Sequence, residues 1–157
     1  MKMKAKRPYI FLIKATIIAL IITVLPLPNY LIQASPFWVL LFYIYWLCYF
    51  SMQWRFFFAL IIGLLLDILN GSLLGQNAIA LILSSAFIIN VKQSFYVSDR
   101  STQQVYVFIS GIIYLGILLL TQVLIQGFDF NWIVIIVPLT TSLFWPPIKL
   151  MLTKLKH

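Results

Sequence analysis

Asp67 is the residue of this sequence best placed to do unusual chemistry, because it is a carboxyl group inside a long apolar segment. The other two acidic residues, Asp99 and Asp129, fall in predicted loops, and the single histidine is the last residue, His157. The single cysteine, Cys48, has no charged neighbour in the sequence that would activate its thiol. Enzymatic catalysis needs a nucleophile with a base, or a metal site, and these residues supply neither. The sequence therefore predicts a protein that is not an enzyme and that holds no catalytic, cofactor-binding or metal-binding residues.

The residues around Asp67 are spaced for close helix packing. Gly63, Asp67, Gly71 and Gly75 recur at every fourth position, and on a helix the first three share one face. Glycines at this spacing let another backbone approach closely. The Asn70–Gly71 pair favours a helix end, which would leave Gly75 beyond the helix. Three roles fit Asp67: an anchor that accepts hydrogen bonds from a neighbouring helix or from the following turn, part of a docking surface, or a proton or ion relay.

Transmembrane helices must position these residues. Of the 157 residues, 63% are apolar and 9% are charged, whereas a soluble domain has about a quarter of its residues charged. A spanning helix takes about 20 residues, so six spans leave no room for a separate soluble domain. We predict an all-α, polytopic six-helix transmembrane bundle that forms a single membrane domain over residues 1–157. The predicted spans are 9–25, 37–50, 56–69, 78–91, 105–125 and 132–152. Five spans with a re-entrant hairpin at 56–91 is the alternative.

The net charge of +8 is read as a topology signal. The basic residues fall in the two chain ends, at the start of the first span, and in the second and fourth loops. They are Lys2, Lys4, Lys6, Arg7, Lys14, Arg55, Lys92, Arg100, Lys149, Lys154 and Lys156. This asymmetry places both termini in the cytoplasm. It predicts contact with anionic lipids at the cytoplasmic face and no nucleic-acid binding, because a nucleic-acid footprint clusters on one face of a folded domain.

The sequence also gives expectations for three further groups of side chains. The aromatic residues of the second span are expected to face lipid and to anchor the helix at the interface; they are Phe42, Tyr43, Tyr45, Trp46, Tyr49 and Phe50. The proline pair after Trp145 predicts a kink in the last span, used either for packing or as a hinge. The polar residues at span ends are expected to have no special role; they are Asn90, Gln103, Gln104, Gln122 and Gln126.

Three motifs resemble the rod shape-determining protein MreD family, in its short gammaproteobacterial form. The first is PFWVLL at residues 36–41 together with Tyr45 and Trp46, and in it Pro36 and Trp38 open the second span. The second and most specific is GLLLDILNGSLLG at residues 63–75. The third is LFWP at residues 143–146, which contains Trp145 and Pro146; Phe144 before the tryptophan and Pro147 after the motif depart from the family pattern.

The resemblance implies a six-helix protein of the bacterial inner (cytoplasmic) membrane whose fold is similar to the substrate-binding subunit of energy-coupling-factor transporters. It implies a non-catalytic scaffold of the elongasome, which helps to control side-wall peptidoglycan synthesis and rod cell shape. The implied partner is the membrane helix of MreC. Through MreC the protein would act on the elongation-specific penicillin-binding transpeptidase and on RodA, with a link to MreB filaments.

The expected role of the glycine face follows from that resemblance. We expect the Gly63–Asp67–Gly71 face to support or to form the docking surface for the MreC helix. The alternative function is a small-molecule-binding membrane subunit of a transporter, which needs a cavity lined by several convergent polar groups.

Overall fold

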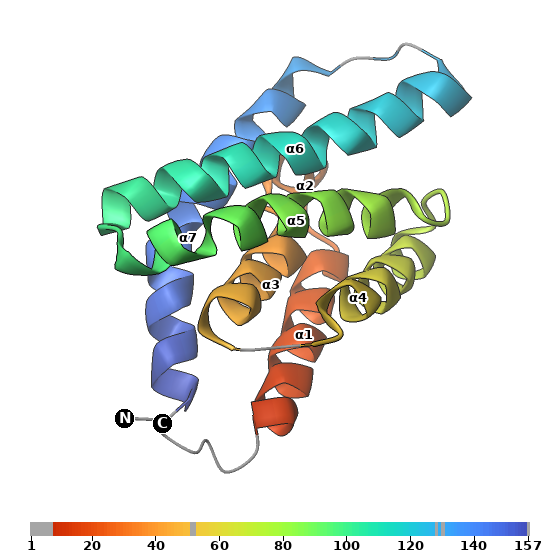
Figure 1. The fold of residues 1–157 in the computed structure, drawn as a ribbon. Helices are drawn as coiled ribbons and strands as arrows, with labels where there is room; N and C mark the ends of the chain where they lie inside the picture. The colour runs from red at the N-terminus through yellow and green to blue at the C-terminus, as the bar shows by residue number, and fades with distance from the viewer. Residues whose placement is uncertain (1–7, 51–52, 128, 130, 157) are drawn as a thin grey trace.

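The computed structural model describes residues 8–50, 53–127, 129 and 131–156, and within this part of the chain every regular element is a helix (Figure 1). The basic N-terminal residues 2–7 and His157 lie outside the described residues. The elements in chain order are α1 (Pro8–Val24), α2 (Asn29–Ala34), α3 (Trp38–Tyr49), α4 (Arg55–Asn70), α5 (Gln76–Val97), α6 (Arg100–Gln126), the 3-10 helix η1 (Trp132–Ile135) and α7 (Ile136–Lys156).

Three of these helices are long and apolar enough to cross a membrane. They cover Gln76–Val97, Arg100–Gln126 and Trp132–Leu155, while α1, α3 and α4 are shorter. Each predicted span coincides with a helix, and the last coincides with η1 and α7 together. The largest difference is in α5, which continues to Val97 instead of ending near residue 91. Its last turns carry polar, outward-facing side chains, which a hydropathy boundary leaves out.

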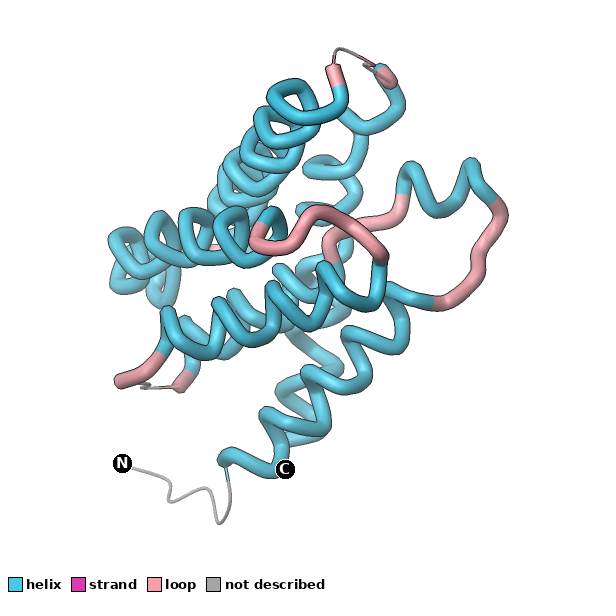
Figure 2. The backbone as a smooth tube through the Cα atoms, turned by 90° about the vertical axis from the view of Figure 1, so that its right-hand side faces the viewer, coloured by secondary structure: helices cyan, strands magenta, loops and turns pink. Residues whose placement is uncertain are grey.

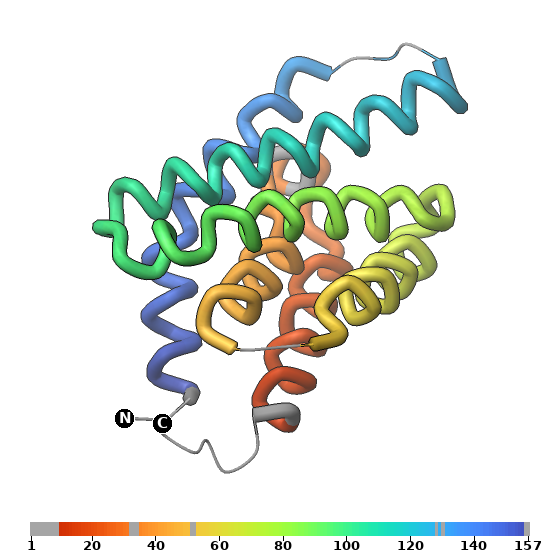
Figure 3. Tube along the Cα trace, in the orientation of Figure 1, coloured from red at the N-terminus to blue at the C-terminus, as the bar shows by residue number. Residues whose placement is uncertain are grey.

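The helix ends gather on two sides of the molecule. The start of α1, the end of α7 and the α5–α6 turn lie toward the lower left of Figure 1, and the α4–α5 turn lies on the opposite side. The short helix α2 lies between two loop segments (Figure 2), and it contacts η1 and α7. The continuous trace shows α5 and α6 lying side by side across the molecule (Figure 3), in agreement with their extensive contact.

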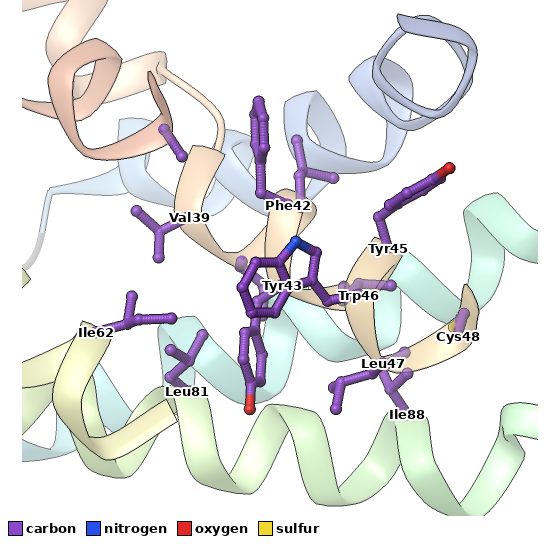
Figure 4. Close-up of a cluster of buried hydrophobic side chains, with 14 of the residues drawn as sticks. Val39, Phe42, Tyr43, Tyr45, Trp46, Leu47, Cys48, Ile62, Leu81 and Ile88 are labelled. Carbon is purple, nitrogen blue, oxygen red and sulfur yellow. The ribbon is translucent and has the colours of Figure 1, made fainter. Parts of the chain in front are cut away.

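Helix α3 lies at the centre of the protein. Ten of its twelve residues are buried, and it contacts α1, α5, α6 and α7. In Figure 4, Phe42 and Tyr43 point to opposite sides of the helix, and Tyr43 extends toward α5. Apolar side chains that cover every face of a helix suit a buried position.

The expectation that the aromatic cluster of this helix faces lipid is therefore wrong. Phe42, Tyr43, Tyr45 and Trp46 are at most 5% exposed, and Tyr49 and Phe50 at the helix end are half-buried. The surrounding helices cover this short helix on all sides, so its rings fill the interior volume.

Candidate functional site

Two glycines form the turn that follows Asp67. Gly71 has a φ of +62°, and its N–H donates to the Ile68 carbonyl at 3.3 Å. The N–H of Ser72 donates to the Asp67 carbonyl at 3.0 Å. These two bonds make a Schellman ending for α4, in which a left-handed glycine closes the helix. Gly75, with a φ of +95°, then leads into α5. The prediction of a helix end at Asn70–Gly71, with Gly75 beyond it, is confirmed.

The side chain of Asp67 is fully buried and accepts four hydrogen bonds. Its Oδ2 accepts from the N–H of Gly75 at 2.8 Å. Its Oδ1 accepts from the Asn77 N–H at 3.1 Å, from Asn77 Nδ2 at 2.7 Å and from the Ser72 hydroxyl at 3.0 Å. Backbone N–H and amide N–H groups can only donate, so both carboxyl oxygens act as acceptors.

The hydrogen bonds continue from Asn77 into a third helix. The hydroxyl of Tyr114 on α6 donates to Asn77 Oδ1 at 2.6 Å. Asn77 and Tyr114 are both buried. We call the connected residues Asp67, Ser72, Gly75, Asn77 and Tyr114 the Asp67 network; it joins α4, α5 and α6 at one level of the bundle.

The electrostatics of this arrangement favour anchoring. A charged carboxylate inside a membrane costs at least a few kcal/mol. Here the backbone N–H groups at the start of α5 point at the carboxylate, and the positive end of the helix dipole stabilises it. Asp67 thus caps α5 from the preceding helix, which matches the anchor role among the three roles considered. The acidic residues Asp99 and Asp129 are not hydrogen-bonded to this network in the described part of the chain.

Gly63 makes the close approach that its spacing suggested, and its partner is α5 of the same chain. A Cβ atom added at Gly63 would lie 2.3 Å from the Ala78 Cα and 2.5 Å from the Ala78 backbone nitrogen. The face that carries Gly63 and Asp67 is therefore already occupied within the chain. In this structure the face can support a docking surface by holding α4 against α5, while a second protein's helix would have to dock elsewhere.

The first and third motifs of the sequence meet at the start of α3. Pro36 is buried, and the next N–H, that of Phe37, donates to the Thr141 hydroxyl on α7 at 3.1 Å. The rings of Trp38 and Phe144 are in edge contact with centroids 5.3 Å apart. Pro36 and Trp38 are thus brought against α7, near the segment that contains Trp145.

The proline pair of the third motif lies inside a helix. Pro146 and Pro147 are interior residues of α7, where each lacks the N–H that would complete the helical hydrogen bond. Trp145, directly before them, is 1% exposed.

Gln103 has a structural role that the sequence analysis did not predict. It is 2% exposed, and its Nε2 donates to the carbonyls of Phe95 at 3.0 Å and Ser98 at 3.2 Å. Its Oε1 accepts from Trp145 Nε1 at 3.2 Å and from Lys149 Nζ at 2.9 Å. The expectation of no special role for Gln103 is wrong, because this amide uses its full hydrogen-bonding capacity to join α5, α6 and α7.

Asn77 and Tyr114 were also missed as partners of Asp67. The sequence offered only a weak indication of these partners. Asn77 and Tyr114 each place a polar group in or beside an apolar stretch, and a buried polar group needs a hydrogen-bond partner. Nothing in the sequence says which polar groups meet. Within the described residues, no three His, Cys, Asp or Glu side chains are grouped as a metal site would require.

Comparisons with known proteins give one match. No curated protein and no solved structure matched the chain. The family model described as rod shape-determining protein MreD matches residues 3–155 of the 157. This family is a shape-determining structural family and is not known as an enzyme family. The chain therefore belongs to the rod shape-determining protein MreD family.

Proposed function

We propose that this protein is a non-catalytic scaffold of the elongasome in the bacterial inner membrane, and that it binds the membrane helix of MreC. The observation that carries the proposal is the state of the Asp67 carboxyl group. It is fully buried, and all four of its hydrogen-bond donors come from its own chain. A carboxylate held in this way fixes the arrangement of three helices and has no free position for a substrate.

In this proposal, six helices span the membrane, namely α1, α3, α4, α5, α6 and α7, with both termini in the cytoplasm. The short helices α3 and α4 would be accommodated by local thinning of the bilayer. The orientation rests on the basic residues near the helix ends on one side, among them Arg55, Lys92, Arg100 and Lys154. These residues would also contact anionic lipid head groups. We infer that the bundle is similar to the substrate-binding subunit of energy-coupling-factor transporters.

A groove beside α1 is our candidate for the MreC contact. It has a volume of about 400 Å³ and is lined by apolar residues of α1 and the segment after it, with Leu69 of α4. On α1, Ile17 and Ile21 are 50% and 59% exposed. In a bilayer, helices associate through close packing of such surfaces, and a groove accepts the side chains of a partner helix better than a flat face does.

The test is co-purification of MreC with this protein from native membranes. Ile17→Trp and Leu69→Trp fill the groove, whereas Ile112→Trp and Leu120→Trp place the same side chain on exposed positions of α6. We expect the groove variants to recover about tenfold less MreC, which corresponds to about 1.4 kcal/mol of binding energy, and the α6 variants to match the wild type.

Two outcomes distinguish a failure of the proposed scaffold function from a failure of the groove as the MreC contact. Failure of the unmodified protein to bring down MreC would overturn the scaffold function. Normal recovery of MreC with all four variants would reject the groove and leave the scaffold function standing. Identification of the co-purified proteins also tests the indirect partners, which are the elongation-specific penicillin-binding transpeptidase, RodA and MreB.

A further inference from the structure

A cavity lies beside the Asp67 network, on the side of the bundle where the α4–α5 turn is found. Its volume is about 490 Å³, within the range of about 300–1,000 Å³ that is usual for small-molecule sites. The segment before α3, the α4–α5 turn, α6 and the start of α7 all contribute to its lining. The scaffold function proposed above does not use this cavity.

Part of the cavity lining is polar and uncharged. It carries the side chains of Asn70, Ser72, Gln76, Asn77 and Tyr114. The side chains of Ser72, Asn77 and Tyr114 are engaged in the Asp67 network. The amides of Asn70 and Gln76 make no hydrogen bond within the described residues, so each offers a donor and an acceptor to a ligand.

The rest of the lining is largely apolar, and its residues include Phe37, Leu40, Leu66, Leu118 and Val137. A cavity lined mainly by apolar side chains with a few placed polar groups fixes the orientation of an amphiphilic molecule. The polar end of such a molecule would face the α4–α5 turn.

The charge of the ligand follows from what lines the cavity. None of the lining residues carries a charged side chain. The nearby carboxylate of Asp67 is 0% exposed and already accepts four hydrogen bonds. An anionic ligand would find no cation and would be repelled by this carboxylate. A cationic ligand could not reach the carboxylate and would lose its hydration without a partner.

We propose that this cavity binds an uncharged amphiphile whose hydroxyl or amide head group bonds to Asn70 and Gln76 while its alkyl tail packs against the apolar lining residues. The head-group chemistry is that of a neutral sugar, polyol or amide. Binding at this site requires neither transport nor catalysis.

The experiment uses the full chain in phosphatidylcholine nanodiscs with tritiated hexyl β-D-glucoside as the probe, and empty nanodiscs measure partition into lipid. Gln76→Leu removes the free amide at similar volume, and Val134→Trp fills the cavity from η1. Gln122→Leu and Val123→Trp are the matched controls on α6, because neither residue lines the cavity. Protection of the buried Cys48 thiol from alkylation verifies that each variant is folded.

We expect a saturable component of about one probe per protein. Unlabelled glucoside should compete for it, whereas hexyl phosphate and hexyltrimethylammonium should not. Loss of one hydrogen bond in Gln76→Leu should weaken binding about tenfold, and Val134→Trp should abolish it, with both controls unchanged. Absence of saturable binding, equal competition by a charged head group, or full binding by folded Val134→Trp would each overturn the proposal.

Discussion

Replacing Asp67 by asparagine changes one atom of the buried site and tests whether that site is an anchor. The substitution keeps the shape of the side chain, so a role that needs shape alone would survive it. In the structure, however, both carboxyl oxygens face donors: the Gly75 N–H at Oδ2, and two N–H groups of Asn77 at Oδ1. An asparagine amide must place its own NH₂ group against one of these sets.

The expected loss of stability in Asp67→Asn is estimated from the less unfavourable of the two orientations of the new amide. With the NH₂ at the Oδ2 position, one charge-assisted hydrogen bond of 2.8 Å becomes a contact between two donors. A hydrogen bond to a charged group contributes about 1.5–3 kcal/mol. The other three bonds weaken when the charge is removed, but the cost of burying that charge also disappears. We therefore expect Asp67→Asn to lower the free energy of unfolding by about 2 kcal/mol.

Thermal unfolding of the purified protein provides the assay, because the single cysteine is buried and reports its own exposure. A thiol-reactive fluorogenic dye labels Cys48 when the bundle opens. A loss of 2 kcal/mol predicts a midpoint lower by about 4–8 °C for a chain of this size. Asp99→Asn is the control, because Asp99 is exposed and its side chain makes no capping hydrogen bond. Equal midpoints for Asp67→Asn and Asp99→Asn would refute the anchor argument.

A paired substitution sharpens the same test. Asn77→Asp alone places a second carboxyl oxygen at 2.7 Å from Asp67 Oδ1, so it should also destabilise the protein. In the double variant Asp67→Asn/Asn77→Asp, the new amide at position 67 can donate to the new carboxylate, and Tyr114 keeps its acceptor. The double variant should therefore be more stable than the sum of the single effects predicts, by about 1 kcal/mol or more. Strict additivity would show that Asp67 and Asn77 are not coupled.

Two more substitutions test the packing contacts with the same dye assay. Gly63→Ala puts a Cβ atom 2.3 Å from the α5 backbone, so α4 and α5 must separate, at a cost of about 3 kcal/mol. In contrast, Gly116→Ala meets nothing within 4 Å and should be neutral or slightly stabilising; a similar midpoint for the two variants would contradict the close approach. Gln103→Leu leaves Trp145 Nε1 and an ammonium group on α7 without their acceptor, and should cost about 3 kcal/mol. Gln104→Leu, at a half-buried neighbouring position, is its control, and equal stability of the two variants would argue against the Gln103 contacts.

Local sequence patterns were enough to locate the longer helices, but they did not predict the short helix α2. Long apolar runs have few ways to satisfy their backbone in a bilayer other than as helices, and the Asn70–Gly71 pair supplied the left-handed residue that closes α4. Hydropathy was less informative at the end of α5, where polar residues continue the helix to Val97. A hydropathy boundary marks where apolar character ends, and a helix can continue beyond it.

The same sequence patterns did not predict which side chains are buried inside the bundle and which face the lipid. The aromatic residues of α3 suit a lipid-facing position and a buried position equally well, because hydrocarbon and protein interior are similarly apolar. Their placement depends on how α1, α5 and α7 pack around α3. The side-chain hydrogen bonds of Gln103 reach Phe95 and Ser98, shortly before it in the chain, and also Trp145 and Lys149 on the distant helix α7. No local pattern contains this whole set of partners.

The sequence by itself determined that this is a helical membrane protein with one acid in an apolar segment and glycines arranged around it. These properties follow from composition and short-range spacing, and three motifs were enough to identify the family. The tertiary structure decided what the acid does. It placed Asp67 against the start of α5, gave Gly63 an intramolecular partner, and brought in Asn77 and Tyr114. The four donors to Asp67 come from the turn after α4 and the start of α5, whereas Tyr114 comes from a helix distant in sequence. The buried carboxylate is an anchor here because the α4–α5 turn and the start of α5 supply all of its donors, and helix packing then links Asn77 to α6.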